Sequence, residues 1–471
     1  METVLIKALQ LLCCLSLLVV LHEGGHFGFS KLFGVKVEKF YMFFDYKFHL
    51  FSTKCKWFTR LFPRFKDHET EYGIGWIPLG GYVKIAGMVD ESMDTEQLKQ
   101  PAQPNEFRSQ KVWKRFFIMF GGVLMNLITA WVLYAIVLLA WGRDYVPMKS
   151  ITAGFQYNEQ AHDIGFCDGD IPVAADGKTI TEYSTAVMRT IANANTITVL
   201  RDGQEVELQM PDDLSMLQMI QAQPTFLTPM APAIIDSVIP GSAAAKAGLE
   251  AGMRLVEVNG CCIGTWADYD YQVTLRREDV LSSPDCTADD SLQWRQLTAI
   301  VASADLSRTD TVQMMLDNQY LMGVTRQLPA FKTEHLSYNA ATCIPAGLSY
   351  GWRVLKSYVS DLKYVASADG AKSVGSFITI GNIFPSSWDW QQFWMLTAFI
   401  SIILAVMNIL PIPGLDGGHI VLLLYEGVTG RVPSDKAMEW IEKIGITLLI
   451  ALMLLAMSND IRNFVLPLFG L

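Results

Sequence analysis

The sequence contains few charged residues and no excess of basic ones. Charged side chains make up 18% of its 471 residues, hydrophobic ones make up 51%, and the formal net charge is −10. This composition is too apolar for an ordinary soluble protein, and the negative balance argues against nucleic acid as a partner. Because the length exceeds one typical domain, we expect several membrane spans together with water-soluble domains.

CxxC motifs and the sequence features of a cleavable leader are also missing. No CxxC pair occurs, so no structural zinc site is indicated, and spacing alone does not decide whether disulfides form. The first apolar run lacks a basic start and a small-residue cleavage site, which predicts a retained span. The eight cysteines are scattered: Cys13, Cys14, Cys55, Cys167, Cys261, Cys262, Cys286 and Cys343.

The motif LHEGGHFG, from Leu21 to Gly28, lies within that first apolar run. In a helix, His22 and His26 stand one turn apart on one face, where two imidazoles can reach one metal ion. Glu23 lies beside them, where its carboxylate could take a proton from a metal-bound water. Ionisable groups at membrane depth cost about 2.5–3.5 kcal/mol on insertion scales and are usually functional. The alternative is a polar patch on the exposed end of a hydrophobic helix.

Hydropathy and charge predict a multi-pass α-helical membrane protein with about four spans. The expected spans are residues 1–33, 116–141, 393–425 and 444–461. Residues 34–115 are rich in Lys and Arg, which places them on the cytoplasmic side. Residues 142–393 contain no long apolar run, and four crossings place them on the opposite, outer side of the membrane. The same four crossings place residues 426–443 back on the cytoplasmic side.

The cytoplasmic loop contains an unusually apolar segment, Glu71 to Gly87. Alternating apolar residues broken by Gly80 and Gly81 predict a membrane-associated β-hairpin or curved strand pair. An exposed strand edge there could bind an extended peptide by adding a strand; a small surface hairpin is the alternative. The polar, Pro-containing stretch from Met88 to Phe107 is typical of a flexible linker.

The extracytoplasmic region contains an internal repeat. Residues 161–171 and 244–254 match at a constant offset, and each copy predicts a short helix, a Gly turn, a strand and a tight hairpin. The pattern resembles PDZ domains of bacterial envelope proteases, which implies two PDZ-like α+β domains, 145–230 and 231–330, each with a groove for an extended peptide. Pro172 is expected to interrupt a strand of the first, and the second carries an insertion between Glu278 and Asp290.

An amphipathic pattern follows, within residues 333–370. It predicts a helix near the membrane surface or, alternatively, a helix packed on the second PDZ-like domain. Its apolar positions are Leu348, Trp352, Leu355, Tyr358, Leu362 and Val365.

The third span ends in MNILPIPGLDGGH. The Pro-x-Pro breaks the helix at membrane depth, and Asp416 follows the break, either as a ligand or as the N-cap of the next helix. His419 is a rival ligand. In the second span, Asn126 indicates either an interhelix hydrogen bond or a site residue. Gly24, Gly25 and Gly28 allow either close helix packing or room beside a metal.

These motifs together resemble the site-2 protease family, specifically its RseP-type bacterial regulators of sigma-factor signalling. The resemblance covers nearly the whole chain in order, including the NxxPxPxLDGG motif that begins at Asn408. It implies that His22, His26 and Asp416 bind Zn²⁺ and that Glu23 activates water. It further implies that Asn408 and Asn126 help to hold the substrate strand, and we expect Gly80 and Gly81 of the apolar segment to bind the substrate as well.

The chain departs from the family pattern at three places. Family members often have Gly-Pro before the asparagine of the second span, where this chain has Gly121-Gly122. They often have Gly-Phe-Gly after the first span, where this chain has Phe43-Phe44-Asp45. Their usual Ser-Gly-Pro before the third span is only weakly represented at residues 374–376. These departures affect substrate handling and loop geometry rather than the metal site.

We therefore expect an intramembrane zinc metalloprotease of the bacterial inner membrane. Its substrates would be single-span membrane proteins, of the anti-sigma-factor or signal-peptide-remnant type, held in the lipid bilayer. The PDZ-like domains would exclude intact substrates or bind freshly cut peptide ends. The alternatives are a membrane scaffold without activity and a metal-ion transporter, although a transporter would carry more intramembrane carboxylates.

Overall fold

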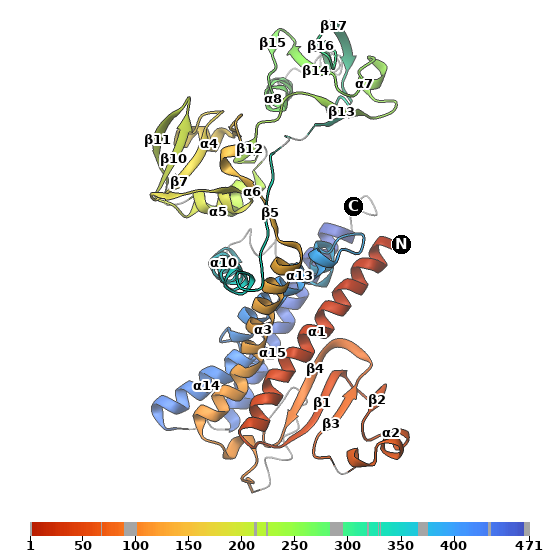
Figure 1. Cartoon of the computed structure of the whole chain (residues 1–471), viewed down its shortest axis with the longest axis vertical. Helices are drawn as coiled ribbons and strands as arrows, with labels where there is room; N and C mark the ends of the chain where they lie inside the picture. The colour runs from red at the N-terminus through yellow and green to blue at the C-terminus, as the bar shows by residue number, and fades with distance from the viewer. Residues whose placement is uncertain are drawn as a thin grey trace. The chain divides into compact units, whose positions relative to one another are not determined.

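The computed structural model describes residues 2–66, 68–88, 101–211, 214–222, 225–282, 295–317, 320–327, 329, 331–365, 375–431 and 435–465. The chain forms two compact units, one made of Met1–Arg143 with Ser337–Leu471 and the other of Asp144–Leu336 (Figure 1). Most of the predicted linker after Met88, most of the predicted insertion after Glu278, and residue 374 fall outside the described residues.

The first unit contains the predicted apolar helices. Among the described residues, four are long and apolar enough to cross a membrane: α1 (Glu2–Leu32), α3 (Val112–Trp141), α13 (Trp390–Ile409) and α15 (Asp435–Asp460). Four apolar helices were expected, and these four fit a multi-pass membrane protein. A membrane protein must satisfy its backbone polar groups internally, and helices do so within a single segment.

Helices α1 and α3 approach closely at a pair of glycines. A Cβ on Gly25 would lie 2.1 Å from the carbonyl oxygen of Gly121, so neither position has room for a side chain. A Cβ on Gly24 or Gly28 would meet nothing within 4 Å. Close helix packing therefore explains Gly25, in the manner of small-residue interfaces in membranes.

The third apolar helix breaks at the proline motif, as expected. Helix α13 ends at Ile409, and α14 (Asp416–Thr429) begins with the carboxylate of the motif. The intervening turn packs against α15, where a Cβ on Gly445 would lie 1.8 Å from the carbonyl oxygen of Pro413. A largely buried ion pair between Arg115 and Glu426 joins α14 to α3.

The predicted β-hairpin at 71–87 is wrong in its pairing. Strands β3 (Glu71–Ile74) and β4 (Ile77–Ile85) both form, but β1 (Val37–Phe44) lies between them. β1 pairs with β3 in parallel and with β4 in antiparallel register, and β2 (Phe51–Ser52) completes the order β2-β3-β1-β4. The two-residue connection after Ile74 therefore crosses the end of β1 instead of folding β4 back onto β3.

The sheet lies against α1, and a half-buried carboxylate, Glu71, links three of its strands. Glu71 accepts hydrogen bonds from the hydroxyl groups of Tyr41 (2.6 Å) and Ser52. Burial opposes ionisation of Glu71, but these hydrogen bonds lower its pKa below the usual value. Gly81 allows β4 to approach the helix, because a Cβ there would lie 2.9 Å from Val19 Cγ1.

The second unit contains two sheets with the same strand order. The first runs β11-β10-β7-β8 and the second β17-β16-β14-β15, and each packs around its own hydrophobic core. Equivalent strands thus occupy equivalent places in the two sheets, as duplication of one unit would produce. The strands are β7 (Ile171–Ala175), β8 (Lys178–Thr179), β10 (Thr196–Arg201), β11 (Gln204–Gln209), β14 (Arg254–Val258), β15 (Cys261–Cys262), β16 (Gln296–Ala302) and β17 (Thr309–Met315).

Short helices and strands complete both parts of this unit. Two-stranded sheets pair β6 with β12 and β13 with β18, and β19-β5-β9 forms a three-stranded sheet. The strands are β5 (Arg143–Pro147), β6 (Phe155–Tyr157), β9 (Glu182–Tyr183), β12 (Leu227–Pro229), β13 (Ile235–Val238), β18 (Val324–Arg326) and β19 (Glu334–Leu336). The helices are α4 (Glu159–Ile164), α5 (Ala186–Ala192), α6 (Met216–Gln221), α7 (Ala243–Lys246) and α8 (Trp266–Ser282).

The expectation that Pro172 interrupts its strand is wrong. Strand β7 runs through Pro172, which pairs with Val199 of β10 next to a register shift. On its other side, β7 pairs with β8 only at Ala174 and Ala175. Proline is tolerated beside bulges and where a neighbouring strand has ended, because no ladder hydrogen bond is lost there.

The predicted amphipathic helix is α10 (Cys343–Val365). Its residues Leu355, Tyr358 and Leu362 pack on a core shared by α3 and α13, whereas Leu348 and Trp352 are exposed. The predicted apolar stripe is therefore divided between helix packing and the surface. The remaining helices of the first unit are α2 (Lys56–Leu61) and α12 (Phe377–Ile383), with short 3₁₀ turns at Pro63–Phe65 and Phe107–Ser109 and a π turn at Ile461–Val465.

A buried carboxylate in the second unit gives a stability prediction. Asp170 is 1% exposed and accepts two hydrogen bonds from the Arg201 guanidinium, at 2.8 and 2.7 Å. Replacing Asp170 with Ala should destabilise this unit by about 2–3 kcal/mol, because the arginine loses its bidentate partner. Hydrogen exchange of the β7 and β10 amides in the full chain measures this loss. Asp202→Asn, an exposed neighbour in a turn, is the matched control and should change little.

Candidate metal centre

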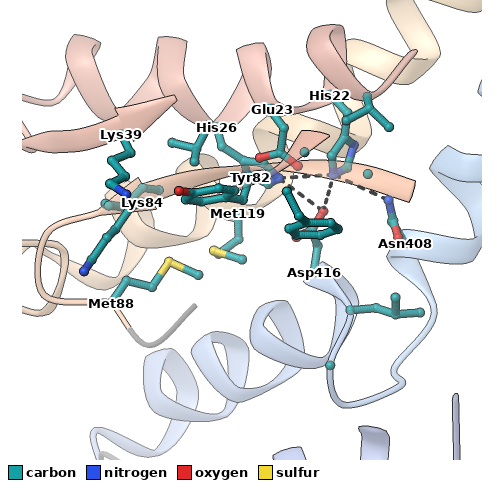
Figure 2. Close-up of a pocket in the computed structure, with 18 of the residues that line it drawn as sticks. His22, Glu23, His26, Lys39, Tyr82, Lys84, Met88, Met119, Asn408 and Asp416 are labelled. Carbon is teal, nitrogen blue, oxygen red and sulfur yellow. Dashed lines mark hydrogen bonds and ion pairs between the residues drawn. The ribbon is translucent and has the colours of Figure 1, made fainter. Parts of the chain in front are cut away.

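Three polar groups from opposite ends of the chain meet among the apolar helices. His22 and His26 lie on α1, and Asp416 begins α14 after the proline break. Asp416 Oδ2 lies 3.3 Å from His22 Nε2 and 3.4 Å from His26 Nε2, and the two Nε2 atoms are 3.3 Å apart (Figure 2). In the described part of the chain, no other group of His, Cys, Asp and Glu residues forms such a cluster.

The donor set fits a zinc ion. Asp416 Oδ2 is buried and has no hydrogen-bond partner, although it points at the two imidazoles. A buried polar atom without a partner is costly, and a cation among these atoms removes that cost. Two imidazole nitrogens and one carboxylate oxygen are ligands that Zn²⁺ prefers, and three protein ligands leave a fourth position open, as in catalytic sites.

Neighbouring groups orient both histidines. His26 Nδ1 lies 2.8 Å from the carbonyl oxygen of Ile118, so an Nδ1–H donates there and leaves the Nε2 lone pair facing Asp416. His22 Nδ1 lies 3.2 Å from the side-chain amide of Asn126, which is fully buried. The amide nitrogen of Asn126 is placed nearest the ring, and its amide oxygen has no partner. Exchanging these two atoms, which look alike in shape, lets the oxygen accept from an Nδ1–H and leaves the Nε2 lone pair of His22 facing Asp416. The orientation of both rings is therefore set by α3.

Gly122 on α3 is part of the centre, and sequence reasoning missed this. A Cβ at this position would lie 2.4 Å from His26 Nε2 and 2.8 Å from His22 Nε2. The glycine thus forms the wall against which both rings lie. Its presence in a Gly-Gly pair was visible in the sequence, but only the packing of α3 on α1 reveals the contact.

A pocket of about 730 Å³ opens on the cluster. Glu23 points into it between the two histidines (Figure 2), and Gly80 and Gly81 of β4 form part of its wall. Asn408 also lines it, with its amide nitrogen 3.5 Å from His22 Nε2. The structure thus brings together, around one pocket, predicted residues from the histidine motif of α1, from strand β4 and from the segment that contains Asn408 and Asp416.

Two other predicted residues have different surroundings. Asn126 is not part of the pocket wall, and it contacts His22 at Nδ1, the ring nitrogen that does not face Asp416. His419 lines the pocket one turn after Asp416 but is not in the three-residue cluster. Tyr82, Lys39 and Lys84 extend the wall, and the Tyr82 hydroxyl donates to Asp45 at 2.9 Å.

The chain is similar to a family of membrane peptidases over almost its whole length. Residues 10–452 match peptidase family M50. A "Putative zinc metalloprotease" of Xylella fastidiosa is 28% identical over 470 residues, covering 95% of this chain and 96% of its own. "Regulator of sigma-E protease RseP" of Escherichia coli is 26% identical over 472 residues, with the same coverage. "Protease RseP" of Yersinia pestis is 27% identical over 483 residues, covering 98% and 99%.

The Gly122 contact gives a test of the metal centre. Gly122→Ala should abolish stoichiometric zinc binding, because the methyl group would occupy the space of both imidazoles. Gly24→Ala, within the histidine motif but facing open space, should keep full zinc content. Zinc per chain, measured by elemental mass spectrometry of purified protein, distinguishes the two. Full zinc content in the Gly122 variant would contradict the geometry.

The buried amide gives a second test. Asn126→Leu should weaken zinc binding about 10- to 100-fold, as losses of ligand-orienting partners typically do. The control is Thr129→Val, which removes a buried hydroxyl from the same helix one turn away. Competition with a zinc chelator gives both affinities. Equal affinities would show that His22 does not need the amide.

Proposed function

The chain belongs to peptidase family M50 and is a site-2-type zinc metalloprotease of the membrane, and from this we propose that it cleaves membrane-spanning segments of single-span proteins with Glu23 as general base. The observation that supports this is the convergence of His22, His26 and Asp416 within the apolar helices, with Glu23 in the same pocket. We assign the three as zinc ligands. The anti-sigma-factor and signal-peptide-remnant types remain our candidate substrate classes.

The chemistry divides between the metal and the chain. When bound, zinc supplies a Lewis acid that polarises the scissile carbonyl and lowers the pKa of a water molecule. The Glu23 carboxylate takes a proton from the attacking water and returns it to the leaving amine. Ile118 and Asn126 hold the two histidines so that both Nε2 atoms face one point.

Strand β4 is suited to holding an unwound substrate. A helical substrate hides its carbonyl groups in backbone hydrogen bonds, so the segment to be cut must be extended. β4 is the last strand in the order β2-β3-β1-β4, and its residues Gly80 to Ile85 line the pocket. Strand addition along β4 would replace the hydrogen bonds that unwinding costs, with Asn408 as a further contact.

The sheet-rich middle of the chain supports a pair of PDZ-like domains, 145–230 and 231–330. The shared strand order of the two sheets is the main support for this assignment. We place these domains on the extracytoplasmic side of a bacterial inner membrane, because the Lys- and Arg-rich segment 34–115 belongs on the cytoplasmic side. There they would restrict entry of substrates with an intact outer domain or bind a cut peptide end.

Removing the base separates catalysis from metal binding. Glu23→Gln should retain one zinc per chain and lower the turnover of a single-span substrate by about 10²–10⁴-fold, the usual contribution of a general base. Cleavage in reconstituted membranes and zinc content are measured on the same preparation. Asp416→Ala is the comparison, since it should lose both zinc and activity.

Two results would contradict this proposal. Undiminished cleavage by the Glu23 variant would remove its assigned role. Failure of the parent chain to retain zinc would favour a scaffold whose histidine pair has no catalytic use.

A further inference from the structure

The segment between β1 and β3 has an unusual composition. From Tyr46 to Lys66 it contains six basic residues, seven Phe, Trp or Tyr residues and no Asp or Glu, in a chain whose net charge is −10. None of this stretch belongs to the pocket wall except Tyr46. The proposed protease mechanism therefore does not account for it.

Large apolar side chains in this segment face outward. Helix α2 (Lys56–Leu61) has no buried residue. Trp57, Leu61 and Phe62 are 60%, 66% and 44% exposed, respectively. Trp57 and Leu61 stand one helical turn apart, and large apolar side chains gathered on an exposed surface often mark a site of interaction.

The cations around this patch are not used for internal ion pairs. Within the part of the chain that the structure describes, Lys56, Arg60, Arg64 and Lys66 are exposed and make no ion pair. Lys54 instead closes the segment, because its ammonium donates to the carbonyl oxygens of Lys66 and His68, both at 2.8 Å. Cationic and aromatic side chains therefore alternate on the exposed surface of this segment, whose two ends are joined by the Lys54 hydrogen bonds.

The segment lies next to the end of a membrane-spanning helix. Helix α1 ends at Leu32, and β1 begins at Val37. Lys31, in the last turn of α1, forms an ion pair of 2.5 Å with Glu69, just beyond the segment. Figure 1 draws α2 near the level of the C-terminal end of α1. At this level a bilayer presents its headgroups, where Trp and Lys or Arg side chains are favoured.

We propose that Lys56, Trp57, Arg60, Leu61, Phe62, Arg64 and Lys66 form a lipid-binding surface for anionic phospholipid headgroups. The basic residues neutralise the headgroup phosphates, and Trp57, Leu61 and Phe62 enter the boundary between headgroups and acyl chains. Charge complementarity and continuity with the span of α1 favour a lipid over a protein partner. This binding fixes the β1–β4 sheet, and hence strand β4, at a defined depth in the membrane.

Hydrogen exchange of the full chain in nanodiscs tests this surface. Amides of residues 54–66 should exchange about five- to tenfold more slowly when phosphatidylglycerol is mixed into phosphatidylcholine than in phosphatidylcholine alone. Substituting Lys56, Arg60, Arg64 and Lys66 together by Gln should abolish this difference. These side chains are exposed, so the sheet should keep its own protection, and the β1 amides report on its folding in the same experiment.

The matched control makes the same charge change elsewhere. Replacing the exposed residues Lys178, Lys246, Arg308 and Lys332 by Gln should leave the lipid-dependent protection intact. The proposal would be overturned if the amides of residues 54–66 exchanged equally fast in both lipids. It would also be overturned if their lipid-dependent protection survived the substitutions of Lys56, Arg60, Arg64 and Lys66. Either result would favour a protein occupant. Because the readout is lipid contact, its failure would leave the proposed proteolysis untouched.

Discussion

The structure depends on holding two imidazoles and a carboxylate at one point among apolar helices. Polar groups there are costly unless each has a partner, and Asp416 Oδ2 has none within the protein; the proposed zinc ion would supply it. The surrounding architecture serves this contact. Gly25 and Gly121 let α1 and α3 touch, Gly122 leaves room for both rings, and the break after Ile409 brings Asp416 to them.

The metal centre and the proposed substrate strand share one wall. Gly81 brings β4 against Val19, one turn of α1 before His22. The same helix therefore sets the position of the ligands and of the strand that lines the pocket with Gly80. On the proposed role of β4, a shift of the sheet along α1 would move an extended substrate relative to the histidines, which would tie catalysis to the depth of the sheet. This is why attachment of the neighbouring α2 surface to lipid would have a consequence beyond anchoring.

The sequence was sufficient for local patterns and insufficient for contacts between distant segments. Hydropathy located the four apolar helices, and helical spacing with the LDGG motif identified His22, His26 and Asp416 as a group. The hairpin prediction failed because β1 is a distant partner, and no feature of residues 71–87 shows that another strand lies between β3 and β4. Gly122 and the orienting role of Asn126 become visible only when α3 packs on α1. The expectation that Pro172 interrupts its strand was wrong because β7 tolerates the proline where the neighbouring strand β8 has already ended, which the sequence around Pro172 does not show.

The coordination of the bound metal tests the central claim most directly. X-ray absorption at the zinc edge, recorded on the full chain in membranes, reports the number and type of ligands. The account predicts two imidazole nitrogens and one carboxylate oxygen from the protein, at about 2.0–2.2 Å, with a further oxygen from solvent. A third imidazole, which would implicate His419, or any sulfur ligand would contradict it.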